Sequence, residues 1–197
     1  MAAVLSVRLK LLPVEQRLRA PFELFGDKLV LTTSFGPTSA VLLHLISSVH
    51  PGVTVLNIRH GHETRQTLDF IEYCNELFPI NLKVIQAPHL LIPNAVNREE
   101  FARFQQETKI KPLRYALEDT GAWFWASGVM HDETEERRLM AMARVRHGAV
   151  AIYPILDWTH QQALQFCLQN DLPINNDYFD PCKGPDQSLE CGIHHDN

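Results

Sequence analysis

The sequence predicts an α/β fold with a doubly wound, mostly parallel sheet of five strands and a mobile C-terminal tail. Short apolar, β-branched runs alternate five times with amphipathic segments of about ten residues, which is typical of such sheets. The first apolar run also leads through a glycine-containing turn directly into a helical pattern. We therefore expect one α/β domain over residues 1–170, followed by a tail over residues 171–197 that is rich in turn-forming residues.

Each predicted strand is a short run of apolar and β-branched residues, as expected for strands buried inside a parallel sheet. The predicted strands are residues 29–33, 53–58, 82–87, 122–126 and 149–154. In such sheets ligands bind outside the carboxyl ends of the strands. The candidate site therefore lies in the loops that follow the strands, which are residues 34–39, 59–63, 127–134 and 155–158.

The predicted helices show apolar residues at helical spacing. They cover residues 13–25, 39–49, 64–77, 98–108, 113–119, 134–144 and 159–169. Pro21 interrupts the first of them, and Asp157-Trp158-Thr159 caps the last.

Composition excludes several broad classes of protein. The chain has 197 residues and a formal net charge of −5, which argues against a general binder of nucleic acid or of membrane surfaces. It contains no run of 18 apolar residues, so we expect no membrane span. The first ten residues lack the pattern of a signal peptide, so we expect a cytoplasmic location.

The four cysteines fall into two groups. Cys74 and Cys167 sit among apolar residues in helical patterns, where a buried, structural role is expected. Cys182 and Cys191 lie in the polar tail. In a reducing compartment, exposed thiols of that kind are more often reactive or metal-binding than linked in a disulfide.

The turn after the first strand is the leading candidate for an anion site. Backbone N–H groups and the helix dipole make a turn of this kind suitable for a phosphate. A plain strand-to-helix turn with Ser39 as the N-cap is the alternative. The turn matches neither of the two commonest nucleotide-binding loops. Its candidate binding residues are Ser34, Phe35, Gly36, Thr38 and Ser39.

Two further loops offer charged and imidazole groups. Residues 59–63 read Arg-His-Gly-His-Glu, and residues 127–138 contain His131, Arg137 and Arg138. Arginines there would answer ligand phosphates with forked hydrogen bonds. The alternative is a solvated helix face with i,i+3 pairs over residues 135–138. A metal site made of His60, His62 and His131 is a further alternative.

The tail brings a cysteine together with charged and imidazole groups. Cys191 is flanked by Glu190, Gly192 and the histidines at 194 and 195. Neighbouring cations promote the thiolate, which is the nucleophilic form of cysteine. Cys182 and Cys191 could instead pair with each other, or bind zinc together with His194 and His195. The residue types alone leave these alternatives open.

Four motifs in order resemble one family. They are S-F-G-P-T-S followed by A-V-L-L-H-L, then K-I-K-P-L-R-Y-A-L, then Y-P-I-L-D-W-T, and finally E-C-G-I-H. Over roughly residues 13–197 the chain resembles the phosphoadenylyl-sulfate (PAPS) reductases, which belong to the adenine nucleotide α-hydrolase-like superfamily.

The resemblance implies a nucleotide-binding domain over residues 1–170 and a reductase mechanism. Cys191 would attack the sulfur of a bound phosphosulfate, and the resulting S-sulfocysteine would release sulfite to thioredoxin or glutaredoxin. The implied ligand contacts are the loop residues named above together with Gly61, Lys109, Gly128 and Arg137, with Arg59, His131 and His194 as additional candidates. The family also implies a homodimer. The paired cysteines of its iron–sulfur members are absent here, so we expect neither a cluster nor another cofactor or metal.

The chain departs from the family pattern where fixed cations are usual. The second loop, D-T-G-Y-L-F-P-E-T in the family, reads R-H-G-H-E-T-R-Q-T here. Two family arginines are replaced by Met130 and His131, and another by Tyr115. Each lost charge-assisted hydrogen bond is worth on the order of 1.5–3 kcal/mol, although Arg59 and Arg65 are new. Two alternatives therefore remain: a diverged enzyme acting on another adenylated or sulfur-bearing substrate, and a non-catalytic or zinc-binding accessory protein.

Overall fold

The structure is a computed structural model that describes residues 1–194, and within them the strands form one six-stranded sheet in the order β3-β2-β1-β4-β6-β5. All neighbouring strands are parallel except β5 and β6, which form an antiparallel pair. The strands are β1 Leu29–Thr32, β2 Val53–Arg59, β3 Ile80–Gln86, β4 Phe124–Ser127, β5 Ala143–Arg146 and β6 Ala149–Ile152. The predicted α/β class is confirmed, and the predicted number of five strands is one too few.

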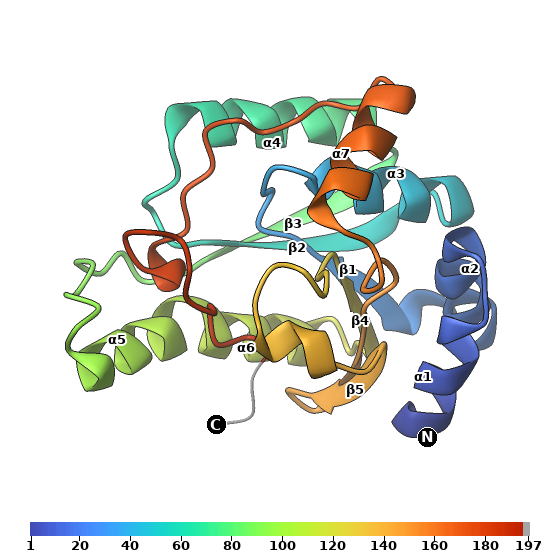
Figure 1. Ribbon diagram of the computed structural model, residues 1–197, viewed down its shortest axis with the longest axis horizontal. Coiled ribbons are helices and arrows are strands. Elements are labelled where there is room, and N and C mark those ends of the chain that lie inside the picture. Colours follow the sequence, from blue (N-terminus) through green and yellow to red (C-terminus); the bar gives the residue numbers. More distant parts are fainter. Residues whose placement is uncertain (195–197) are drawn as a thin grey trace.

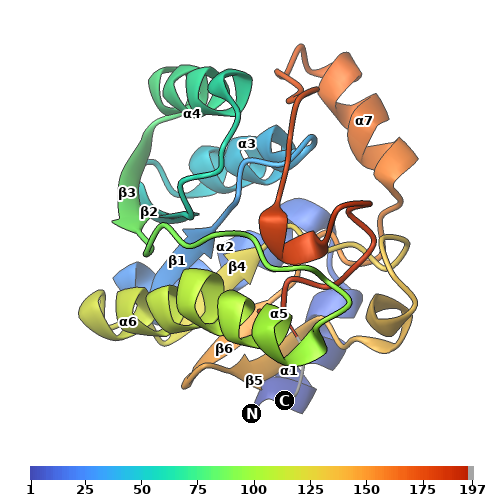
Figure 2. The ribbon, with the colours of Figure 1, turned by 90° about the vertical axis from the view of Figure 1, so that its left-hand side faces the viewer.

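Helices cover both faces of the sheet (Figure 1). The longer helices are α1 Ala2–Lys10, α2 Val14–Phe25, α3 Ser39–Val49, α4 Arg65–Leu77, α5 Arg98–Gln105, α6 Lys111–Asp119 and α7 His160–Gln169. Helices α3, α4 and α7 lie on one side of the sheet, and α5 and α6 lie on the other (Figures 1 and 2). No helix within residues 1–194 has the length and apolar character needed to cross a membrane.

The sixth strand arises where the sequence predicts a helix, so the helix predicted over residues 134–144 is wrong. This segment forms a short 3-10 turn, Glu136–Leu139, and then enters β5. His147 and Gly148 have positive φ angles of 51° and 81°, which is the geometry of a tight hairpin turn between antiparallel strands. The alternation of Arg and apolar residues around His147-Gly148 was the available signal.

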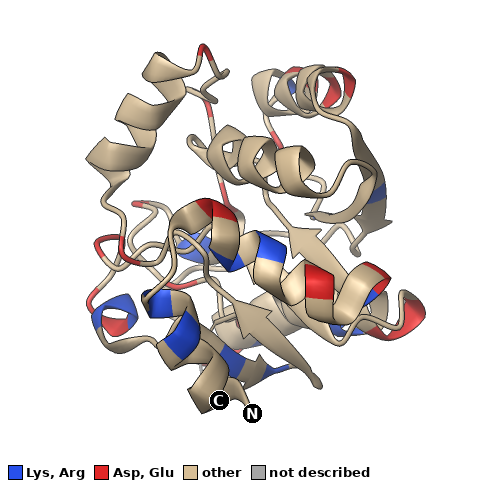
Figure 3. Cartoon of the chain, turned by 90° about the vertical axis from the view of Figure 1, so that its right-hand side faces the viewer, with Lys and Arg blue, Asp and Glu red and all other residues tan. Residues whose placement is uncertain are grey.

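Helix α1, which we did not predict, packs against the edge strand β5. A helix in this position protects the unpaired edge of the sheet. Figure 3 shows several Lys and Arg positions near the N-terminus. Helix α1 carries Arg8 and Lys10, and strand β5 carries Arg144 and Arg146.

An ion pair between the buried Arg17 and the exposed Asp157 fixes α2 to the segment that precedes α7. Arg17, 7% exposed, binds both carboxylate oxygens of Asp157 at 2.6 and 2.8 Å and the carbonyl of Pro154 at 2.8 Å. Burial opposes ionisation of Asp157, but its hydrogen bond to Arg17 holds the pKa of this carboxyl below its ordinary value. The D-W-T motif therefore belongs to the scaffold as well as to the α7 cap, where Thr159 and Gln162 form a capping box.

Arg17→Ala is expected to lower the free energy of unfolding by about 2–3 kcal/mol, because it leaves Asp157 and a buried carbonyl without their charged partner. Urea unfolding at pH 7 measures the loss. The deficit shrinks as the pH falls through the lowered pKa of Asp157, because the protonated carboxyl no longer needs Arg17. Arg65→Ala removes the exposed pair with Asp69 and is the matched control, with an expected change below about 0.5 kcal/mol. Equal losses in the two variants would contradict the prediction.

The described part of the tail, which the sequence predicts to be mobile, is packed on the body in this arrangement. It runs from α7 towards α5 (Figure 2). The side chain of Asn175, 1% exposed, donates hydrogen bonds to the Phe35 carbonyl and to Thr67. Cys182 and Cys191 are 0% and 6% exposed, so their predicted exposure is wrong. The predicted burial of Cys74 and Cys167 is confirmed.

Candidate active site

The turn between β1 and α3 forms one wall of a cavity of about 170 Å³. Most of the predicted ligand contacts line this cavity, namely Ser34, Gly36, Thr38, Ser39, Lys109, Gly128, Arg137, Cys191 and His194. Phe35, Arg59, Gly61 and His131 do not line it. The residues that meet here come from the ends of β1 and β4, from the α5–α6 junction and from the tail.

The loop has two parts with different roles. Phe35 has a φ of 56°, and its side chain is fully buried near Phe70. Its predicted ligand contact is therefore limited to its backbone. Helix α3 begins at Ser39, and Thr38 is the N-cap without a side-chain cap bond, so the interpretation of Ser39 as N-cap is wrong. The Ser39 hydroxyl oxygen is buried and has no hydrogen-bond partner within the described residues.

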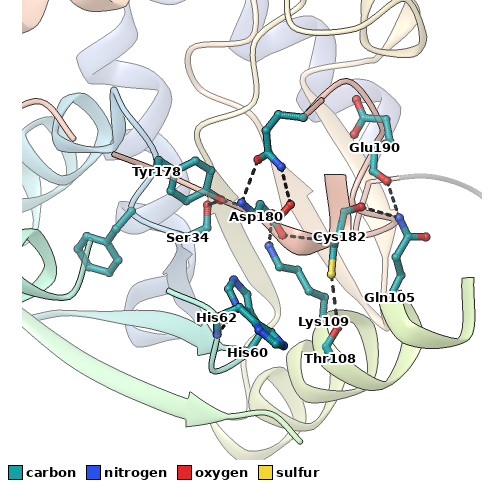
Figure 4. Close-up of polar contacts among 12 residues, drawn as sticks. Ser34, His60, His62, Gln105, Thr108, Lys109, Tyr178, Asp180, Cys182 and Glu190 are labelled. Carbon is teal, nitrogen blue, oxygen red and sulfur yellow. Dashed lines mark hydrogen bonds and ion pairs between the residues drawn. The ribbon is translucent and has the colours of Figure 1, made fainter. Parts of the chain in front are cut away.

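Lys109 reaches the cavity from a π-helical turn, Gln106–Ile110, that joins α5 to α6. Such turns often occur at functional sites. The Lys109 side chain is 4% exposed, and its ammonium group pairs with the Asp180 carboxylate of the tail (Figure 4). Burial alone would raise the pKa of Asp180, but the charge of Lys109 holds it below the ordinary value. The pair is therefore ionised at neutral pH, and Asp180 stands where a ligand anion could bind Lys109.

Arg137 forms the second buried ion pair with the tail. Its Nε and Nη2 atoms bind the Glu190 carboxylate at 2.6 and 2.9 Å, and Nη1 pairs with Glu133. The hydrogen bond to Glu190 raises the pKa of Arg137 against the effect of burial. The alternative interpretation of Arg137 as part of a solvated helix face is therefore wrong, while Arg138 does make the exposed i,i+3 pair with Glu135 that this alternative expects. Glu190 thus fixes its neighbour Cys191 to the wall of the cavity.

Tyr178 and Lys183 complete the tail side of the cavity, and the sequence interpretation missed both. The Tyr178 hydroxyl donates to Ser34 at 2.8 Å and also contacts Asp180 (Figure 4). Within residues 1–194 the Lys183 ammonium makes no ion pair, so it is a third cation available to a ligand. The N-cap pattern Asp180-Pro181, in which Asp180 accepts from the Cys182 amide, was the signal that this stretch is ordered.

The final described residues are held by close packing. Gly192 has a φ of 80°, and an added Cβ would meet Ile110 at 3.0 Å, so the glycine of E-C-G is required on both counts. His194 stacks on Trp125 at 5.6 Å between ring centroids, and its Nδ1 lies 3.3 Å from the Tyr153 hydroxyl. His195, a predicted zinc ligand, lies outside the described residues.

The second loop lies beside the cavity and forms a stack of histidine rings. His62 stacks with His60 at 5.9 Å and with His89 at 4.5 Å, whereas the His131 ring contacts the Met140 carbonyl. The predicted His60–His62–His131 metal site is therefore not assembled. Residues 1–194 contain no group of three or more His, Cys, Asp or Glu side chains that could hold a metal ion. The buried Nε atom of Arg59 has no partner among these residues.

His60→Asn is expected to make stability less sensitive to acid. Burial and the charge of Lys109 lower the pKa of His60 from 6.5 to about 4, so the unfolded chain binds a proton between these values that the folded chain does not. Stability attributable to His60 is therefore lost as the pH falls from 6.5 to about 4. Asn retains an acceptor for the His62 amide, which donates to His60 Nδ1.

Urea unfolding at pH 7 and pH 5 measures this effect. The wild type should lose more stability between the two pH values than His60→Asn does. His160→Asn, at an exposed position that starts α7, should keep the wild-type loss. An identical loss in all three proteins would contradict the prediction.

Comparisons with known proteins identify the family of the chain. The sequence model of the phosphoadenosine phosphosulfate reductase domain matches residues 28–183. A phosphoadenosine 5′-phosphosulfate reductase of a Synechococcus strain is 35% identical over 160 residues, which cover 77% of this chain and 69% of that protein. The protein of the same name from a Synechocystis strain is 30% identical over 167 residues, covering 79% and 66%.

A solved structure supports the fold. The crystal structure of PAPS reductase from Candida auris, a phosphate complex, superimposes with a TM-score of 0.71 at 22% identity, covering 88% of this chain and 87% of that one. The match of the family model over most of the chain, together with the first relative, establishes the affiliation that the four motifs indicate. This chain belongs to the PAPS reductase family.

Proposed function

We propose that this chain reduces PAPS to sulfite and adenosine 3′,5′-bisphosphate, with Cys191 as the nucleophile. The observation that carries the proposal is that Cys191 and the loop after β1 line one cavity. The names of the relatives, phosphoadenosine 5′-phosphosulfate reductases, support it.

The reaction has two substitutions at sulfur. The Cys191 thiolate attacks the sulfuryl group, the bond from that sulfur to the bridging phosphate oxygen breaks, and adenosine 3′,5′-bisphosphate leaves with the electron pair. Cys191 then carries an S-sulfonate. A thiol of thioredoxin or glutaredoxin attacks the Cys191 sulfur and sulfite leaves with the electron pair of the sulfur–sulfur bond.

The cavity supplies positive charge for this reaction. The loop after β1 and the N-terminus of α3 line the cavity, a position that suits a phosphosulfate group, and Lys109, Arg137 and Lys183 provide cations. Lys109 and Arg137 are paired with tail carboxylates in the described arrangement. Ligand anions must therefore replace Asp180 and Glu190 when the substrate enters. This replacement requires the part of the 171–197 tail that carries these two carboxylates to move away from the domain at residues 1–170.

A second candidate substrate is an adenylated compound with fewer negative charges. Met130, 2% exposed, lines the cavity at a position where the family carries an arginine, and the apolar Val129, 3% exposed, lies next to it. A thermal-shift comparison of adenosine 3′,5′-bisphosphate with adenosine 5′-phosphate separates the two. Stronger stabilisation by the 3′-phosphorylated nucleotide supports PAPS, and equal stabilisation supports the alternative.

Two further expectations belong to this proposal. Reduced cysteines and a thioredoxin-type reductant fit a cytoplasmic location. The family resemblance supports a homodimer, which light scattering after gel filtration would test.

The decisive experiment is incubation with radiolabelled PAPS and thioredoxin. Labelled sulfite should form with the wild type and fall below detection with Cys191→Ser. Cys167→Ser, buried in α7 away from the cavity, is the matched control and should retain activity. Absence of sulfite from the wild type, or equal activity of Cys191→Ser, would overturn the proposal.

A further inference from the structure

The second tail cysteine lies next to the proposed nucleophile. Cys182, Cys191 and Phe104 form a small buried cluster that is separate from the main core. The Nε2 atom of Gln105 donates to the Cys182 carbonyl at 2.8 Å and to the Glu190 carbonyl at 2.7 Å (Figure 4). One amide nitrogen thus holds together the two backbone segments that carry the cysteines.

The two thiols face different surroundings. Cys191 lines the cavity, whereas Cys182 does not. The Cys182 sulfur lies 3.3 Å from the Thr108 hydroxyl, on the π-helical turn that also carries Lys109. Only Cys191 can therefore meet a ligand held by the loop, and Cys182 stands behind it as a thiol that the first substitution does not use.

We propose that Cys182 is a resolving cysteine that releases sulfite from Cys191 within the same chain. This inference rests on the proposed function, which supplies the S-sulfonate. The Cys182 sulfur attacks the Cys191 sulfur, the bond between Cys191 and the sulfonate breaks, and sulfite leaves with its electron pair and takes up the thiol proton as hydrogen sulfite. The Cys182–Cys191 disulfide forms, and the external dithiol reductant then reduces that disulfide instead of a sulfonate.

The surroundings of Cys182 give this step its order. Burial raises the pKa of the Cys182 thiol to about 12, against the opposing effect of Lys109, so in the packed tail this thiol stays protonated. Movement of the tail that admits water removes the cause of the rise and favours the thiolate. A neighbouring thiolate then has the advantage of proximity over a thiol that arrives from solution.

A single-turnover experiment without reductant tests the proposal. The reduced full-length chain is mixed with a stoichiometric amount of PAPS. The adenosine 3′,5′-bisphosphate and sulfite that are released are then quantified, and the mass of the protein is measured. The wild type should release about one sulfite per chain and lose the mass of two hydrogens, with residues 182 and 191 cross-linked in the digest. Cys182→Ser, which retains a partner for Thr108, should form the same nucleotide product but keep the sulfonate on Cys191. Cys74→Ser should behave as the wild type.

The outcomes separate the two proposals. A wild type that forms adenosine 3′,5′-bisphosphate but keeps the sulfonate as stably as Cys182→Ser does would overturn the resolving role and leave the proposed function standing. No nucleotide product from any variant would overturn the proposed function itself. A second measurement needs no PAPS: the wild type is equilibrated in dithiothreitol redox buffers, and the fraction with a Cys182–Cys191 disulfide is measured. Failure to form the Cys182–Cys191 disulfide there also overturns the inference.

Discussion

Arg137→Gln is expected to lower kcat/KM for sulfite release at least about a hundredfold. Arg137 is 4% exposed and forks onto Glu190, the residue before Cys191. A hydrogen bond to a charged group contributes about 1.5–3 kcal/mol, and about 1.4 kcal/mol is a factor of ten in rate. When the substrate anion replaces Glu190, Arg137 makes its bonds to that anion instead, and the loss of two such bonds accounts for the expected size.

A double variant shows whether Arg137 acts on the substrate directly or only by holding the tail through Glu190. Arg137→Gln removes the guanidinium that both Glu133 and Glu190 bind, so its free energy of unfolding also falls. The double variant with Glu190→Gln removes one of these carboxylates and should regain stability in urea while staying at least about a hundredfold slow. Recovery of kcat/KM to near the wild-type value would show that Arg137 acts only by holding the tail. Arg138→Gln, at the exposed neighbouring position, should change neither quantity.

Local sequence patterns sufficed to predict the parallel part of the sheet. The β1 residues Leu29, Val30 and Leu31 are each at most 1% exposed, and a strand buried on both faces must be continuously apolar. The loop after β1 was predictable for a similar reason, because its turn residues and the helix that follows are adjacent in sequence. The segment that became β5 was not, because its Glu- and Arg-rich start resembles an exposed helix and its pairing depends on β6.

The tail side of the site depends on contacts between residues far apart in sequence. Asp180 pairs with Lys109 across 71 residues, and Glu190 pairs with Arg137 across 53. Turn-forming residues over 171–197 therefore suggest a mobile segment until these partners are known. The sequence does predict that Lys109, Arg137 and Cys191 belong to one site. It does not reveal that tail carboxylates neutralise two of the cations, because charge pairing over that separation leaves no local pattern.

Asp180→Asn is expected to strengthen binding of adenosine 3′,5′-bisphosphate about tenfold while making the protein less stable. The Asp180 carboxylate pairs with the ammonium group of Lys109 in the cavity, so a ligand anion that binds Lys109 must displace this carboxylate. Asn cannot compete as an anion, and the buried ammonium, left without its partner, then favours the ligand. Because the buried ammonium of Lys109 then lacks its partner, Asp180→Asn without ligand should lose about 3 kcal/mol or more of unfolding free energy. Lys109→Met should weaken binding at least about a hundredfold.

Isothermal titration with adenosine 3′,5′-bisphosphate and urea unfolding measure the two effects. Asp186→Asn is the matched control, because Asp186 lies in the same tail but is exposed, and the contact it makes within residues 1–194 is a local one with Ser188. It should change neither affinity nor stability appreciably. Opposite shifts of affinity and stability in Asp180→Asn identify the carboxylate as a competitor of the ligand. Weaker binding in both Asp180→Asn and Lys109→Met would instead show that the ion pair as a whole is part of the binding surface, because the carboxylate would then be needed to hold Lys109 in place for the ligand.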